Sequence, residues 1–176
     1  MRITGGNLRG RLLGSPKVKG VRPTTDRLRS AIFSILSQKV TDAYVLDLFA
    51  GTGAFGIEAL SRGAKFVVFL DKDTHSLKEN LTKLQINENI KIFSGDFFSI
   101  LKKISISFDI IFIDPPYGKY KPSLILNSIK HLCANQTTVV YEEDKNTLFD
   151  NIDDFFLEKD SRIYGDTQIK IYGVKG

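Results

Sequence analysis

The sequence predicts an α/β fold: a seven-stranded, mostly parallel sheet that ends in an antiparallel β-hairpin. Three observations lead to this fold class. Short apolar runs alternate with segments of helical periodicity from residue 44 onward, as in repeated βαβ units. The internal runs are almost wholly apolar, which is typical of strands buried on both faces. The last two runs, residues 155–164 and 167–172, flank a Gly165-Asp166 turn, which is typical of a hairpin.

The elements before the hairpin follow from the same patterns. Five strands are expected at residues 44–49, 66–71, 90–94, 108–114 and 137–142. Helices are expected at residues 54–62, 74–84, 97–101 and 123–133. Upstream, residues 2–4 and 11–13 flank a Gly-Gly-Asn turn and are expected to pair as a short hairpin. Thr24 or Thr25 can cap a helix that runs to about Leu36. Its expected buried face carries Leu28, Ala31, Ile32, Ile35 and Leu36.

The first expected strand of the sheet leads into a glycine-rich turn, Asp47-Leu-Phe-Ala-Gly51-Thr-Gly53. The two glycines permit a tight turn and a close approach of the backbone to a ligand. Asp47 would repel the pyrophosphate of a dinucleotide, and it suits a cationic ligand such as S-adenosylmethionine, with its ammonium and sulfonium groups. The next strand ends at Asp71, at the spacing where nucleotide-binding folds hold ribose hydroxyls, and Asp73 is a rival for that role.

A second motif, Asp114-Pro115-Pro116-Tyr117, follows a strand that is expected to be buried, at the edge where open α/β sheets bind ligands. The exocyclic amine of a nucleobase is a poor nucleophile because its lone pair is delocalised into the ring. The Asp114 carboxylate and the Pro115 carbonyl can accept its two N–H bonds and expose the lone pair. The prolines remove competing N–H donors, and Tyr117 can stack on an unstacked base. The motif therefore predicts methyl transfer to a nucleobase amine.

Two N-terminal stretches narrow this reading: Met1-Arg-Ile-Thr-Gly-Gly-Asn-Leu-Arg-Gly-Arg11 and Arg22-Pro-Thr-Thr-Asp-Arg-Leu-Arg29. With both motifs, the chain resembles the bacterial small-subunit (16S) ribosomal RNA guanine-N(2) methyltransferase family over nearly its whole length. The resemblance implies a Rossmann-like class I methyltransferase fold, S-adenosylmethionine as cofactor and a guanine amine as acceptor. It also implies that the segment from Asp114 to Tyr117 is catalytic.

The expected site residues fall into three groups. The catalytic group is Asp114, Pro115, Pro116 and Tyr117. The cofactor-binding group is Asp47, Phe49, Ala50, Gly51, Thr52, Gly53, Asp71, Lys72, Asp96 and Phe97. The substrate-binding group is Arg9, Arg11, Arg22, Thr24, Arg27 and Lys119.

Positive charge is concentrated at the N-terminus. Residues 1–29 hold eight Lys and Arg and one acid, a net charge of +7, while the whole chain carries +5, so the remainder carries −2. A basic arm on a near-neutral body is typical of contact with a phosphate backbone. We therefore expect residues 1–40 to form a basic RNA-binding extension packed on a methyltransferase domain of residues 41–176. The expected partner is ribosomal RNA, within the small subunit or an assembly intermediate, bound by a monomer.

Composition limits the other classes. The single Cys133 excludes an internal disulfide, the chain has no cysteine cluster for a metal, and no metal site is expected. The longest apolar runs have strand length, and the N-terminus lacks the apolar core of a signal peptide. A cytoplasmic protein is the expectation.

Three alternatives stay open at this point. An adenine amino-methyltransferase acting on DNA or another RNA is the main one, because the same tetrapeptide serves both bases. A sequence-specific DNA enzyme needs a sizeable module to read base edges, and recognition of a folded RNA by shape fits a small basic arm better. A nucleotide- or RNA-binding protein without catalysis would not need both motifs. A dehydrogenase is disfavoured by Asp47 and by the lack of a second domain.

Overall fold

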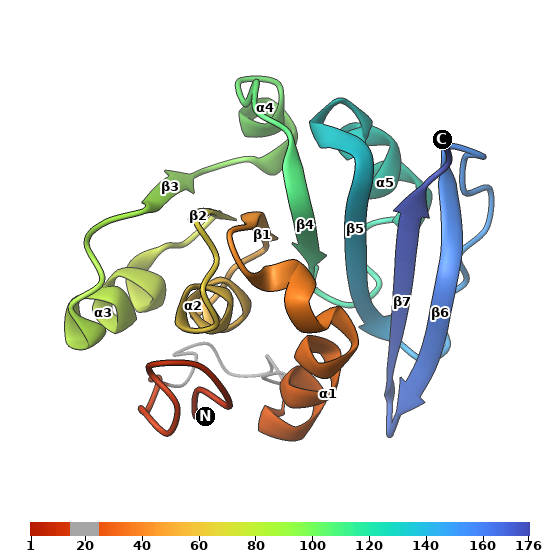
Figure 1. The fold of residues 1–176 in the computed structure, drawn as a ribbon. Coiled ribbons are helices and arrows are strands. Elements are labelled where there is room, and N and C mark those ends of the chain that lie inside the picture. Colours follow the sequence, from red (N-terminus) through yellow and green to blue (C-terminus); the bar gives the residue numbers. More distant parts are fainter. Residues whose placement is uncertain (15–24) are drawn as a thin grey trace.

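The computed structural model describes residues 1–14 and 25–176, which form one twisted seven-stranded sheet of order β3-β2-β1-β4-β5-β7-β6 (Figure 1). The parallel strands are β1 (Tyr44–Leu48), β2 (Phe66–Asp71), β3 (Ile90–Ser94), β4 (Phe108–Ile113) and β5 (Cys133–Asp144). β6 (Phe156–Tyr164) and β7 (Thr167–Val174) are antiparallel, and β7 pairs with β5. The predicted fold class, including the closing hairpin, is confirmed.

Helices cover both faces of the sheet. α1 (Asp26–Leu36), the short 3-10 helix η1 (Ser37–Val40), α2 (Ala54–Ser61) and α3 (His75–Leu84) share one hydrophobic core. α4 (Phe97–Leu101), α5 (Pro122–Ile129) and the 3-10 helix η2 (Lys130–Leu132) pack in the other. Side chains alternate between the two cores along β1, since Val45 points to the first and Leu46 to the second.

The region between α5 and β5 differs from the prediction. The expected helix of residues 123–133 ends at Ile129, and the expected strand of residues 137–142 begins already at Cys133. The pairing of β4 with β5 is irregular between Phe108 and Ile110, where the Thr137 hydroxyl donates to the Phe108 carbonyl at 2.6 Å. This side-chain bond replaces regular strand pairing, which apolar periodicity does not reveal.

α1 begins as predicted, because the Thr25 side chain accepts a hydrogen bond from the Leu28 N–H at 3.2 Å. Its buried face, however, includes Arg29 and Phe33, whereas Ala31 and Ile35 are only half-buried. Arg29 is one of the eight cations counted in the net charge of residues 1–29, but it does not add to the exposed positive surface. Its side chain is fully buried and pairs with Glu58 of α2 at 3.1 Å.

Residues 1–14 are packed on α2 rather than extended. The predicted hairpin is reduced to one antiparallel bridge between Arg2 and Leu12, and Ile3 and Leu13 are buried in the core shared by α1 and α2. The Thr4 N–H and hydroxyl both donate to the Glu58 carboxylate. The N-terminal segment is therefore built into the same core as the sheet.

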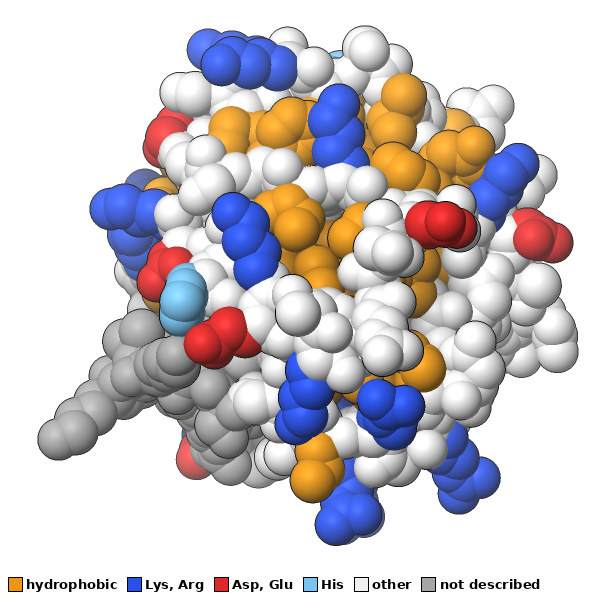
Figure 2. Space-filling view, turned by 90° about the vertical axis from the view of Figure 1, so that its left-hand side faces the viewer, with side chains coloured by type: hydrophobic (Ala, Val, Ile, Leu, Met, Phe, Trp, Pro, Cys, Tyr) orange, Lys and Arg blue, Asp and Glu red, His pale blue; other side chains and the backbone are white. Residues whose placement is uncertain are grey.

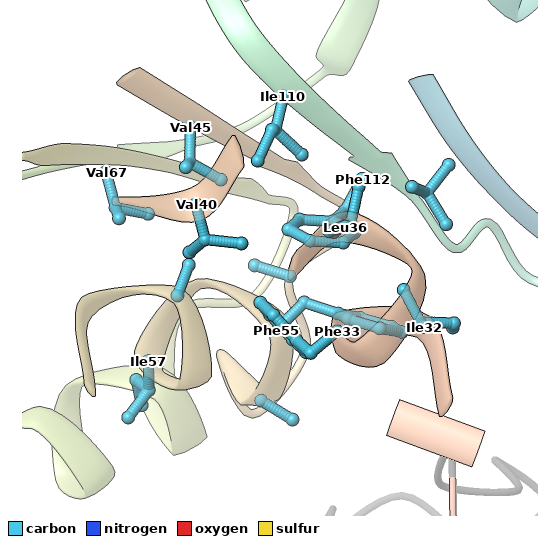
Figure 3. Packing of buried hydrophobic residues seen from close by; sticks show 14 of the residues in the cluster. Ile32, Phe33, Leu36, Val40, Val45, Phe55, Ile57, Val67, Ile110 and Phe112 are labelled. Atoms are coloured by element: carbon cyan, nitrogen blue, oxygen red, sulfur yellow. The ribbon is translucent and has the colours of Figure 1, made fainter. Parts of the chain in front are cut away.

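Aromatic packing fixes α2 against β4 (Figure 3). The Phe55 ring, in the first turn of α2, stacks on Phe112 of β4 with centroids 4.8 Å apart, and Phe33 of α1 packs on the same ring at 5.4 Å. Since Phe112 lies two residues before Asp114, this contact holds the predicted catalytic motif, residues 114–117, and the start of α2 in a fixed relation.

Candidate active site

The glycine turn connects β1 to α2 with an unusual backbone. Phe49 has φ +61°, a left-handed conformation that bulky residues rarely adopt, and such outliers persist where the surrounding structure enforces them. Gly53 has φ +79°, and a Cβ there would lie 2.4 Å from the Leu77 side chain. A Cβ on Gly56 would lie 2.2 Å from the Phe69 ring, so only glycine lets α2 pack this close to β2.

Asp47 lies beneath this turn, with only 1% of its surface exposed. Its carboxylate accepts a hydrogen bond from the Gly56 N–H at 2.8 Å. Burial raises the pKa of Asp47 to about 8, the Gly56 N–H opposes this, and the negative charge of Asp71 adds to it. The structure thus gives Asp47 the role of holding α2 on the turn. Its expected contact with a cationic ligand stays a prediction.

Asp71 and Asp73, the two candidates for binding the ribose, differ in their hydrogen-bond partners. The Asp71 carboxylate accepts from the Gly51 N–H at 2.8 Å and from the Asp73 N–H at 2.9 Å, so it borders the turn directly. The Asp73 carboxylate accepts from the His75 N–H at 2.9 Å and therefore serves the start of α3. Lys72, between them, is exposed. Asp71 is the candidate that the geometry favours.

The buried backbone of Thr52 is held by a residue that the sequence reasoning missed. The Asn80 side chain donates to the Thr52 carbonyl at 2.9 Å and accepts from the Gly14 N–H at 2.7 Å. Asn80 is buried within the apolar stripe of α3, and a polar residue in that stripe is the signal that could have identified it.

Asp96 and Phe97 lie after β3, and the structure treats them differently. The Asp96 carboxylate is exposed and accepts from the Ser99 N–H and hydroxyl at 3.0 and 2.9 Å; these bonds, with the backbone bond first, lower its pKa. Phe97 is 4% exposed, because Phe49 and Tyr120 pack on its ring with centroids at 5.1 and 5.5 Å. These two aromatic side chains cover the Phe97 ring in the free protein, and its expected contact with the cofactor stays a prediction.

The predicted catalytic motif, Asp114 to Tyr117, lies next to the glycine turn. The Asp114 N–H donates to the Leu48 carbonyl at the end of β1, at 3.4 Å. Pro115 is buried and Pro116 is exposed. Tyr117 is 40% exposed, and its hydroxyl lies 2.9 Å from the Thr167 hydroxyl. Burial is the main cause that raises the pKa of Tyr117.

Two acidic residues at the end of β5 form hydrogen bonds with Tyr117 and with the residue that follows it. The Tyr117 hydroxyl donates to Glu142 at 3.4 Å, and the Gly118 N–H donates to Glu143 at 3.3 Å. Both glutamates are buried, at 4% and 0% exposure. Sequence reasoning did not select either of them, although two acids at the end of an apolar strand are a recognisable signal.

The expected substrate-binding residues are placed in part. Arg9, Arg11, Arg27 and Lys119 are exposed, and the Lys119 ammonium lies 5.2 Å from the centre of the Tyr120 ring. Figure 2 shows Lys and Arg side chains along the lower part of the face on the β3 side, with hydrophobic side chains gathered above them. Two further expected contacts, Arg22 and Thr24, lie outside the described residues.

Residues 1–14 and 25–176 contain neither a candidate metal site nor a candidate membrane span. Nowhere in these ranges do three or more His, Cys, Asp and Glu side chains form a group that could hold a metal ion. No helix there is long and apolar enough to cross a membrane.

The topology and the glycine turn define the class I methyltransferase fold. An Escherichia coli structure titled "Putative methyltransferase yhhF" has a TM-score of 0.88 at 28% identity, covering 99% of this chain and 98% of that one. At 16% identity, a structure of SMU.776 complexed with SAH shares the fold alone, with a TM-score of 0.70. S-adenosylmethionine is the cofactor of this class.

The chain belongs to the family described as Conserved hypothetical protein 95, whose pattern matches residues 1–173. The Bacillus subtilis (strain 168) relative "Putative rRNA methyltransferase YlbH" is 32% identical over 185 residues, covering 100% of both proteins. The Escherichia coli (strain K12) "Ribosomal RNA small subunit methyltransferase D" is 40% identical over 122 residues. That match covers 68% of this chain and 61% of the relative. The expected family resemblance is thereby confirmed.

Proposed function

We propose that this chain transfers a methyl group from S-adenosylmethionine to the exocyclic N(2) amine of a guanine in small-subunit ribosomal RNA. The observation that carries the proposal is the backbone contact between Asp114 and Leu48, at 3.4 Å. It puts the catalytic motif beside the residue that precedes Phe49 and the glycine turn, so both segments meet at one edge of the sheet. The relatives named as rRNA methyltransferases support ribosomal RNA as the acceptor.

The residues at this edge fit the cofactor. S-adenosylmethionine supplies an electrophilic methyl group on its sulfonium. A Cβ at Gly51 would find only the Phe49 carbonyl, at 3.9 Å, so the turn has open space beside it. The Asp71 carboxylate would hold the ribose hydroxyls and Asp96 the adenine amine, with Lys72 between them. Asp47 would hold the turn through the Gly56 N–H, and Phe97 would support it by packing on Phe49.

The motif Asp114-Pro115-Pro116-Tyr117 would activate the amine. The Asp114 carboxylate and the Pro115 carbonyl accept its two N–H bonds, which frees the nitrogen lone pair for in-line attack on the methyl group. Tyr117 stacks on the base, with its ring orientation set by the hydroxyl contact to Thr167 at 2.9 Å. The alkylated amine is acidic, and Asp114 or water takes its proton. Positioning and electrostatics supply most of the rate.

The RNA would lie across the exposed cations Arg9, Arg11, Arg27 and Lys119, with Arg22 and Thr24 as further contacts expected from sequence. Residues 1–14 cover α2, which at eight residues is about 12 Å long, so one folded RNA can meet the N-terminal arginines and the catalytic edge together. We propose a monomeric cytoplasmic enzyme that acts on the small subunit or an assembly intermediate.

The test is radiolabelled methyl transfer to three acceptors: naked small-subunit RNA, small subunits from a strain that lacks this gene, and duplex DNA. Nucleoside analysis then identifies the product. We expect N(2)-methylguanosine on a ribosomal acceptor. Methyladenine, or label on DNA alone, would instead assign an adenine amino-methyltransferase, which the catalytic motif serves equally well. Cofactor binding without label on any acceptor would contradict the proposed substrate.

A further inference from the structure

Glu143, the penultimate residue of β5, has acceptor capacity that the protein does not fill. Its side chain is fully buried. One carboxylate oxygen, Oε1, accepts from the Gly118 N–H at 3.3 Å and from the Asp144 N–H at 2.9 Å. The other, Oε2, has no hydrogen-bond partner. A buried carboxylate oxygen without a donor is costly, and such atoms are normally paired with a protein group, a water or a ligand.

The surroundings of Glu143 belong to the catalytic edge. In the parallel pairing of β4 with β5, Ile113 lies opposite Tyr141, so Asp114 and Glu142 come next on the two strands. The Tyr141 hydroxyl is a second buried polar atom without a partner. Both unfilled atoms belong to the last four residues of β5: Glu143 is in contact with Gly118, and the charges of Glu143 and Asp114 both act on the Tyr141 hydroxyl.

Glu143 is covered by the loop that directly follows the predicted catalytic motif. Its carboxylate is in contact with Gly118, the residue after Tyr117. The N···O distance of 3.3 Å is long for such a bond, whose usual range is about 2.7–3.2 Å. This is the contact that an entering base can replace at the lowest cost.

The acidic side chains around Gly118 favour hydrogen-bond donors. Asp114, Glu142 and Glu143 all present carboxyl groups, and in residues 1–14 and 25–176 no acidic group is arranged for a metal ion. Guanine carries a ring N–H, at N1, beside its exocyclic amine. Adenine has an unprotonated ring nitrogen at the corresponding place. A flipped base is read through this Watson–Crick edge, so carboxylate acceptors attract guanine and repel the adenine lone pair.

We propose that Glu143 is the residue that selects guanine, with Oε2 accepting the N1–H of the base whose amine is held by Asp114. The inference rests on the proposed guanine-N(2) transfer. In the free protein, burial raises the pKa of Glu143, and the N–H groups of Asp144 and Gly118 and, to a smaller extent, the Thr147 side chain oppose that shift. An additional N–H donor from the base favours the ionised, accepting form in the same way.

The experiment compares guanine with 2-aminopurine, which keeps the same exocyclic amine but has a ring acceptor in place of N1–H. Small-subunit RNA carrying either base at the modified position, identified by the acceptor assay, is assembled into subunits and methylated. We expect the wild-type kcat/KM to favour guanine by about 100-fold or more, because a site built for a donor rejects an analogue that lacks it. Glu143→Gln should lose most of this preference, because its amide can donate to the 2-aminopurine ring nitrogen.

Glu142→Gln is the matched control, since it makes the same change at the neighbouring residue, which contacts Tyr117, and should keep the wild-type preference between the two bases. Equal losses on both bases in Glu143→Gln would show that Glu143 only holds the loop, and would overturn the inference. If Glu143→Gln does not fold, the wild-type enzyme still tests the inference. Equal rates on guanine and 2-aminopurine would show that the enzyme does not recognise the N1–H group. Failure of the proposed function is seen separately, as the absence of N(2)-methylguanosine in the acceptor assay.

Discussion

At the scale of single residues, the carboxylates of the catalytic edge differ in what they hold, and this predicts different outcomes when each is replaced. Asp71 accepts from the Gly51 N–H, whereas Asp114 follows β4 and lies outside the glycine turn. Asp114→Ala removes one acceptor for the amine, so kcat should fall by about 100-fold or more. The affinity for S-adenosylmethionine should change by less than about twofold, because the turn is untouched. Methyl-transfer kinetics measure kcat, and titration calorimetry measures the affinity for S-adenosylmethionine.

Asp109→Asn is the control for this experiment, because Asp109 lies on the same strand at the opposite edge of the sheet. Its carboxylate accepts from the Tyr44 N–H at 2.8 Å, and an asparagine oxygen can still accept that bond. Its methyl-transfer rate should match the wild type. If Asp114→Ala instead lost cofactor binding, Asp114 would belong to the cofactor site and not to the amine.

A pH dependence follows from the burial of Asp47. Its pKa is raised from 3.8 to about 8, so the folded protein binds this proton more tightly than the unfolded chain does. The stabilisation is full below pH 3.8 and is lost as the pH rises to about 8. Asp47→Asn keeps an acceptor for the Gly56 N–H and removes the titration. The free energy of unfolding of the wild type, minus that of Asp47→Asn, should therefore fall between about pH 5 and about pH 8.

The slope of that difference is at most about 1.4 kcal/mol per pH unit, the limit for a single proton. Urea unfolding of both proteins at several pH values measures it, and the other carboxyl groups cancel in the comparison. A difference that stays constant over this range would mean that Asp47 is already ionised at low pH in the folded protein.

At the scale of elements, Glu58 of α2 joins two segments that are distant in sequence, residues 1–14 and α1, to the end of α2. Its carboxylate accepts from Thr4, pairs with Arg29 at 3.1 Å and pairs with Arg62 at 2.9 Å. Glu58→Ala leaves the buried Arg29 without its buried partner, which typically costs about 3–5 kcal/mol. We expect a loss of stability of that size. Hydrogen exchange should also become faster at the Ile3 and Gly10 amides, which donate to the Arg11 and Ile3 carbonyls within residues 1–14.

The pair between Asp26 and Arg29 gives the matched comparison, because the Asp26 side chain is 42% exposed. Asp26→Asn should cost no more than about 1 kcal/mol, since exposed pairs are screened by solvent. Equal losses for Asp26→Asn and Glu58→Ala would show that Glu58 does not anchor the N-terminal segment.

The same elements mark what the sequence could and could not predict. Apolar periodicity and the Thr25 cap predicted α1, because both signals are local. The burial of Arg29 was not predictable, since it depends on Glu58, a residue 29 positions away that becomes a neighbour only when α1 packs on α2. In the same way, Asn80 and Glu143 acquire their roles from contacts with Thr52 and Gly118 that cross between elements.

At the scale of the whole molecule, the two motifs were recognisable because each is a continuous stretch at the end of a strand. Their meeting was predictable from the rule that parallel strands present their carboxyl ends at one edge. The depth of each side chain was not, because it depends on packing. Asp47 and Phe97 are buried, at 1% and 4% exposure, because the glycine turn covers the first and aromatic side chains pack on the second.

The distribution of charge gives a prediction for the molecule as a whole. Residues 1–29 carry +7 against −2 for the remainder, and Arg9 and Arg11 are exposed on the segment that Glu58 holds in place. Each arginine that neutralises a phosphate adds about 0.7–0.9 to the slope of log K against log salt concentration. Replacing both with glutamine should weaken RNA binding and reduce the slope by roughly 1.4–1.8.

The matched control replaces Lys65 and Lys159, two exposed lysines that lie outside the N-terminal segment. Both double variants lose two charges, so a purely global effect of net charge would change the two slopes equally. We expect the control to keep the wild-type slope, because counterions are released only where a cation meets a phosphate. Filter binding over a series of KCl concentrations measures all three proteins. An unchanged slope in the Arg9 and Arg11 variant would exclude residues 1–14 from the RNA contact and move the interface to the other expected cations, Arg22, Arg27 and Lys119.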